Sequence, residues 1–177
     1  MKRQTKGGTL AASLNTLNIK VIGMLDWINN RYGTTFSEND LSSINDFSLI
    51  WNIFENVVCG NDFSIARLQQ NLAHRNMDIQ PFRVHLEYFK NRYVSNGLLT
   101  PRFNHLSFRQ KDRRQLVENV LLETNNNSND IILAIAIIVY RYRNNLFHGI
   151  KDIQQIDQQR DNFEIANNFL TTIIDNF

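Results

Sequence analysis

Residues 130–149 have the sequence DIILAIAIIVYRYRNNLFHG, and this stretch decides the fold of the chain. From Ile131 to Val139 the residues are apolar nearly all round, and a helix of this kind is stable only where other elements surround it. The run has about half of the roughly 18 apolar residues that a membrane span needs. We therefore predict a central, buried helix that ends near Gly149 and does not cross a membrane.

Amphipathic segments on both sides of this stretch supply the elements that would surround it. Ser37 can cap a helix that Gly60 ends, and Pro81 suits the first turn of a helix that Gly97 closes. Apolar residues recur at spacings of three and four, and no strand-like alternation of any length occurs. The pattern predicts an all-α bundle of about six or seven helices, with apolar faces within 10–28, 41–58, 65–72, 82–93, 116–121, 131–139 and 156–177.

The length of 177 residues fits one domain, or one domain with an added helix. We expect residues 1–36 to form the added helix, which Gly33 follows, and residues 37–177 to form the helical domain. Residues 98–107 look like a connector between two helices. The N-terminus carries Lys2 and Arg3 with no compact apolar stretch behind them, so no signal peptide is indicated and we expect a cytoplasmic protein.

Composition limits the kinds of site that the chain can hold. The net charge is +2, which is compatible with nucleic acid as a partner but is weak support alone. Cys59 is the only cysteine, which excludes an intrachain disulfide and a cysteine-cluster zinc site, and its apolar neighbours predict a buried thiol. His74, His85 and His105 are not spaced as metal ligands with any Asp or Glu, so we expect no metal and no cofactor.

The polar end of the central segment carries the residue types of phosphate chemistry. Arg143 offers a planar, permanently charged fork that matches phosphate oxygens. His148 can take and give a proton at neutral pH, and Asn144 could orient the imidazole or bind a phosphate oxygen. The structural alternative is that an Arg and a His at a helix C-terminus only interact favourably with the helix dipole and hydrogen-bond the last carbonyls.

The spacing of the pair adds a constraint. Arg143 and His148 would lie about 140° apart around an ideal helix. They converge only if the last turn unwinds before Gly149, or if each meets one phosphate from a different side. A dimer that brings two pairs together across a symmetry axis is another route.

The string RNNLFHG at 143–149 resembles the R-x(4–6)-H signature of the HEPN family (higher eukaryotes and prokaryotes nucleotide-binding). The likeness includes the polar residue after the Arg, the Leu-Phe before the His and the apolar helix leading in. Residues 47–55, an aromatic-rich segment ending in Glu55, resemble an early helix of such domains. The resemblance covers roughly residues 37–177.

The resemblance implies a metal-independent endoribonuclease with a toxin or phage-defence role, or an RNA-binding or protein-interaction module without turnover. In the first case His148 would transfer protons, Arg143 would stabilise the phosphoryl charge, and Asn144 would position the histidine or the phosphate. Glu55 would hold Arg143 or His148, unless it is a solvated carboxylate. A homodimer is implied, and an antitoxin or defence-system partner is possible; Ile150 stands where some toxins of the family carry a modified tyrosine.

A basic cluster precedes the central segment and is interleaved with aromatic residues. It would track RNA phosphates beside the active site and offer a ring for base stacking. The alternative is a solvated helix start, although positive charge at a helix N-terminus opposes the dipole. The expected RNA-binding residues are Arg109, Lys111, Arg113 and Arg114, with Arg102 nearby and with Arg141 and Lys151 added from the central segment.

Overall fold

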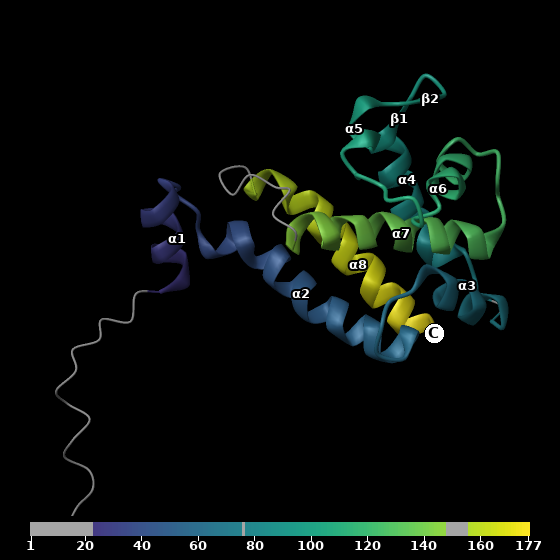
Figure 1. Cartoon of the computed structure of the whole chain (residues 1–177), viewed down its shortest axis with the longest axis horizontal. Coiled ribbons are helices and arrows are strands. Elements are labelled where there is room, and N and C mark those ends of the chain that lie inside the picture. The colour runs from purple at the N-terminus through teal and green to yellow at the C-terminus, as the bar shows by residue number, and fades with distance from the viewer. Residues whose placement is uncertain (1–22, 76, 148–155) are drawn as a thin grey trace, which may run out of the picture.

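The computed structural model describes residues 23–75, 77–147 and 156–177, and in them the predicted all-α bundle is confirmed (Figure 1). The single sheet in this part of the chain is a hairpin of two very short strands. The elements in chain order are α1 (Met24–Tyr32), α2 (Glu38–Cys59), α3 (Ile65–Ala73), η1 (Gln80–Phe82), α4 (Arg83–Tyr93), β1 (Val94–Ser95), β2 (Leu98–Leu99), α5 (Pro101–Asn104), α6 (Arg114–Leu121), α7 (Ser128–Phe147), η3 (Asp157–Gln159) and α8 (Arg160–Asn176).

Helix α7 is the buried centre that its sequence predicts. Every residue from Ile131 to Val139 is buried, because α3, α6, α4 and α8 all pack against this helix. Helix α2 runs along α8 and reaches α7 through its aromatic residues, with the rings of Trp51 and Tyr140 6.1 Å apart. In Figure 1, α7 lies between the α2–α8 layer and the part of the chain that contains α4, α5 and α6.

Helix α2 begins and ends where the sequence predicts. The Asp40 carboxylate accepts hydrogen bonds from the backbone N–H and the hydroxyl of Ser37, at 2.8 and 2.7 Å. These bonds lower the pKa of Asp40 and fix the first turn. At the other end Gly60 adopts the left-handed conformation, with φ of 66°, that a helix C-cap favours.

The segment after Pro81 differs from the prediction in two places. Helix α4 ends at Tyr93, and Gly97 lies in the turn between β1 and β2 instead of closing a helix. Asn96 and Gly97 both have positive φ, 51° and 73°, as a two-residue hairpin turn requires. The expected connector over 98–107 holds strand β2 and the short helix α5.

Some predictions fall on residues outside the described ranges. Of the expected first helix, only the part from Met24 is described, and Gly33 caps it as predicted. The expected end of the central helix at Gly149 also lies outside these ranges. None of the helices in the described residues combines the length and the apolar character that a transmembrane segment needs.

Removal of one buried side chain from α7 should measure how far stability depends on this helix. Ile137 is fully buried, and we expect Ile137→Ala to lower the free energy of unfolding by about 2–5 kcal/mol through reduced burial and a cavity. The matched control is Leu49→Ala on α2, where the side chain is 69% exposed and the expected change is within about 0.5 kcal/mol. Urea unfolding curves that give equal losses for both variants would contradict a core centred on α7.

Candidate functional site

Only part of the polar end of α7 is exposed. Arg141, Asn144 and Asn145 are buried, whereas Arg143 is partly exposed and Phe147 is 55% exposed. The residue types of this stretch indicate polarity but not which side chains find partners inside the protein. At this end of α7, one side of the helix therefore packs inside the bundle and the other side reaches the surface of the protein.

Arg141 serves the interior of the protein. Its guanidinium pairs with Asp112 at 2.9 Å and donates to the backbone oxygens of Leu106 and Ser107 at 2.9 and 2.7 Å. Burial lowers the pKa of Arg141, and the charge of Asp112 opposes that shift. With the side chain 1% exposed, Arg141 has no surface to offer RNA, which corrects the prediction that it contributes to an RNA-binding face.

Asn145 lies one helical turn after Arg141 and holds the same segment. Its side-chain amide donates to the backbone oxygen of His105 at 3.0 Å. Asp112, besides pairing with Arg141, accepts a hydrogen bond from the backbone N–H of Arg109 at 2.7 Å. Together these contacts fix residues 105–112 against the C-terminal part of α7, and so they determine where the basic cluster stands.

Of the predicted catalytic pair, Arg143 lies within the described residues. Its guanidinium donates to the side-chain oxygen of Asn144 at 3.3 Å and lies 5.3 Å from the ring centroid of Phe147. Asn144 therefore contacts the arginine, and its predicted role of positioning His148 or the phosphate stays a prediction. His148 and Lys151 lie outside the described residues, so their predicted roles stay predictions.

Glu55 does not hold Arg143. Its carboxylate accepts a hydrogen bond from the backbone N–H of Phe63 at 3.3 Å, and among the described residues it forms no ion pair with Arg143. The ring of Phe63 packs against Tyr140 with centroids 4.5 Å apart. Glu55 thus supports the packing of α2 against α7, and the part of its predicted role that concerns Arg143 is wrong.

The four predicted basic residues before and at the start of α6 are all exposed. Arg113 has φ of 53° and donates to Gln69, while Arg114 pairs with Glu118 at 2.7 Å and lies over the ring of Phe103. Arg109 and Lys111 form no ion pair with any described residue. These two side chains are therefore the ones best able to meet an external anion.

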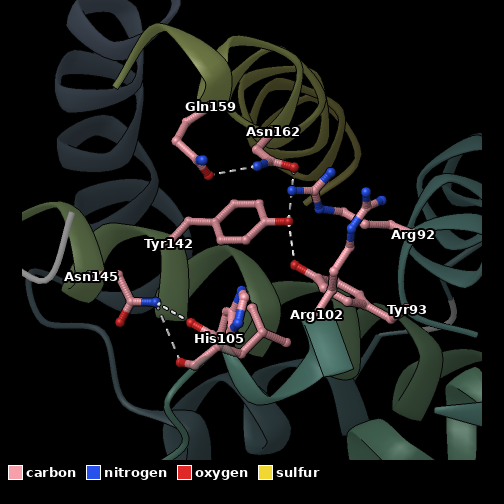
Figure 2. A pocket seen from close by; sticks show the side chains of 9 residues that line it. Arg92, Tyr93, Arg102, His105, Tyr142, Asn145, Gln159 and Asn162 are labelled. Atoms are coloured by element: carbon pink, nitrogen blue, oxygen red, sulfur yellow. Dashed lines mark hydrogen bonds between the residues drawn. The ribbon is translucent and has the colours of Figure 1, made fainter. Parts of the chain in front are cut away.

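A small cavity beside this end of α7 was not predicted. It has a volume of about 150 Å³ and is formed by residues of α4, α5, α7 and α8 with the loop after α5 and η3 (Figure 2). No local sequence signal reveals it, because its residues come from segments far apart in the chain. They are Arg92, Tyr93, Arg102, His105, Leu106, Tyr142, Asn145, Gln159 and Asn162.

The cavity has a hydrogen-bonded polar wall. The hydroxyls of Tyr93 and Tyr142 are 2.7 Å apart, and the side-chain oxygen of Asn162 accepts hydrogen bonds from Tyr142 and Tyr88 at 3.3 and 3.0 Å. Burial raises the pKa of both Tyr93 and Tyr142. Both phenols therefore stay protonated and neutral at physiological pH, so this wall carries no negative charge.

Other chemically active residue types are buried. Cys59 is buried as predicted, and burial raises the pKa of its thiol to about 12, which leaves no thiolate at neutral pH. His85, which is fully buried on α4, contacts the side-chain oxygen of Asn168 at 2.7 Å, and burial lowers its pKa. In the described ranges no three His, Cys, Asp or Glu side chains lie close enough to hold a metal ion.

No family model, curated protein or solved structure matches this chain. The resemblance to HEPN domains therefore depends on the motif at residues 143–149 and on the helices that lead to it.

Breaking the buried ion pair should destabilise the protein far more than breaking an exposed one. We expect Asp112→Ala to lower the free energy of unfolding by about 3–5 kcal/mol, because it leaves the charge of Arg141 buried without a partner. Glu164→Ala, which removes the exposed partner of Arg160, should cost less than about 1 kcal/mol. The double variant Asp112→Ala/Arg141→Met should recover part of the loss. Equal, small effects in thermal and urea unfolding would place Arg141 in solvent.

Proposed function

We propose that this protein is a metal-independent endoribonuclease of the HEPN type, with Arg143 and His148 as its catalytic pair. The observation that supports the proposal best is the setting of Arg143. Arg143 is partly exposed, and its guanidinium contacts Asn144 and the ring of Phe147 at the end of the most deeply buried helix. A charged fork fixed on a rigid helix is suited to stabilising a transition state, because little reorganisation is needed during the reaction.

The proposed reaction is attack of a ribose 2′-OH on the adjacent phosphorus. The P–O bond to the next nucleoside breaks, which leaves a 2′,3′-cyclic phosphate on one product and a 5′-OH on the other. His148 removes the proton from the 2′-OH, and the leaving 5′ oxygen takes up a proton from the resulting imidazolium or from water, so the proton count balances. Arg143 balances the charge that builds on the phosphoryl oxygens, and Asn144 keeps the guanidinium in place.

The basic cluster supplies a path for the strand. Asp112, Arg141 and Asn145 hold the segment that carries Arg109 and Lys111 against the same helix that bears Arg143. Both cations are exposed and can meet successive phosphates. A role in toxin or defence systems, with an antitoxin or similar partner, is part of the proposal that follows from the family resemblance alone.

Loss of either catalytic residue should abolish most of the cleavage. His148→Ala and Arg143→Ala should each lower the rate on single-stranded RNA by about 100-fold or more in the presence of EDTA, since each removes a proton-transfer or charge-stabilising group. The control is Arg83→Ala, an exposed arginine bonded to Gln80, which should keep the wild-type rate. Cleavage that EDTA stops would refute the mechanism, and RNA binding without any cleavage would favour the non-catalytic module.

RNA binding should depend on the exposed cations of the cluster and on salt. The double variant Arg109→Gln/Lys111→Gln should weaken binding to single-stranded RNA with little sequence preference. The slope of log K against log salt should become shallower by about 0.7 for each RNA phosphate that the variant no longer neutralises. Arg31→Gln removes an exposed positive charge from α1 and should change neither the RNA affinity nor the salt slope. Fluorescence anisotropy that shows the same slope for all three proteins would place the RNA on another surface.

We further propose that the protein acts as a homodimer with the motif region at its interface. Phe147 is large, apolar and 55% exposed beside Arg143, and a second copy would remove it from water. Light scattering at tens of micromolar should give twice the chain mass, and Phe147→Asp should shift the protein towards monomer. The control Val84→Asp changes an exposed apolar residue on α4 and should leave the mass unchanged. A wild-type monomer would contradict the proposal.

A further inference from the structure

The cavity beside α7 concentrates positive charge. Arg92 and Arg102 both line it from separate helices, and His105 lines it from the loop that follows α5. None of the nine lining residues is an Asp or a Glu. Figure 2 shows the two arginine side chains beside the hydroxyl of Tyr142 and the amide of Asn162. The cavity therefore presents two permanent cations and an imidazole without a compensating carboxylate in its wall.

Neither arginine is neutralised within the described residues. Arg92 is half-buried, and its side chain hydrogen-bonds the hydroxyls of Tyr88 and Tyr93, which are neutral partners. Its Nε is buried and has no hydrogen-bond partner there. Arg102 is exposed, and no ion pair in this part of the chain includes either residue. A buried guanidinium N–H without an acceptor is costly unless a ligand or water supplies one.

Most of the remaining polar groups of the wall bond to one another, although the side-chain oxygen of Asn145 is buried without a hydrogen-bond partner among the described residues. The oxygen of Asn162 accepts from Tyr88 and Tyr142, and its nitrogen donates to Gln159 at 2.8 Å. The nitrogen of Asn145 donates to the backbone of His105. Donors for a ligand thus come chiefly from the arginines, whose forked N–H groups match the oxygens of a phosphate.

The size of the cavity limits what it can take. Its volume of about 150 Å³ is below the roughly 300 Å³ at which pockets for drug-sized ligands begin, so a whole nucleotide does not fit inside. A single phosphate group does fit this combination of size and charge. Because Arg102 and His105 are exposed, the cavity reaches the surface, where the rest of a larger molecule can remain.

We propose that this cavity is a phosphate-binding subsite formed by Arg92, Arg102 and His105. This inference rests on the proposed function: the phosphate belongs to an RNA strand and lies close to the bond that is cleaved. Tyr142 and Asn145 line the cavity from the same turn of α7 that carries Arg143, so a strand anchored here stands beside the candidate catalytic arginine. The subsite positions the strand and takes no part in bond breaking.

The first experiment measures phosphate binding without RNA. Thermal unfolding is followed in increasing inorganic phosphate, with sodium chloride added so that ionic strength is constant. Phosphate should raise the melting temperature of the wild type, and Arg102→Gln should weaken the apparent affinity by about tenfold through removal of a charged donor. Because Arg102 is exposed, this variant should fold normally. Arg83→Gln is the matched control, with the wild-type response expected.

Either of two results would overturn the subsite: no specific phosphate effect on the wild type up to tens of millimolar, or the same effect in Arg102→Gln.

A second experiment identifies the source of the phosphate. A short single-stranded RNA should compete with phosphate and should bind Arg102→Gln more weakly, whereas 5′-AMP should compete poorly. Competition by 5′-AMP but not by RNA would overturn the assignment to a strand. Since these readouts need no cleavage, an inactive protein that binds phosphate refutes only the proposed nuclease.

Discussion

The structure depends on one constraint, which is that α7 is apolar on every side from Ile131 to Val139 and must be enclosed. Helices α3, α6, α4 and α8 surround it, and the aromatic residues of α2 complete the enclosure. No single neighbour could cover such a helix, so the bundle needs elements from both halves of the chain. The same requirement places the polar end of α7 where several segments meet, and there the functional proposals begin.

At that end the buried polar contacts connect the core to the surface. Arg141 and Asn145 hold residues 105–112 on the helix, with Asp112 as the buried counter-ion. These contacts hold the segment with the exposed cations Arg109 and Lys111 against α7, the helix that carries Arg143 and contributes Tyr142 and Asn145 to the cavity. A ligand with several phosphates suits such an arrangement better than a small neutral molecule does.

Local patterns allowed correct prediction of the elements but not of the partners of polar residues. Ser37 and Gly60 bound α2 as their cap chemistry indicates, and the apolar run of α7 indicated the centre. Arg141 was misjudged because its partner Asp112 lies in another segment, and nothing near either residue shows the pairing. Asn96 and Gly97 are residue types typical of a two-residue hairpin turn, and this turn follows the end of α4 at Tyr93. Arg92 and its cavity required the packed structure.

The central claim is that RNA is cleaved by its own 2′-OH, with Arg143 and His148 supplying charge and protons. The most direct test uses an RNA with one cleavage site and a matched oligonucleotide with a single 2′-deoxy nucleotide on the 5′ side of that bond. In EDTA, the account predicts cleavage of the RNA to a 2′,3′-cyclic phosphate and a 5′-OH, identified by mass spectrometry, and no cleavage of the 2′-deoxy oligonucleotide. Equal cleavage of both, or products with a 5′-phosphate, would contradict it.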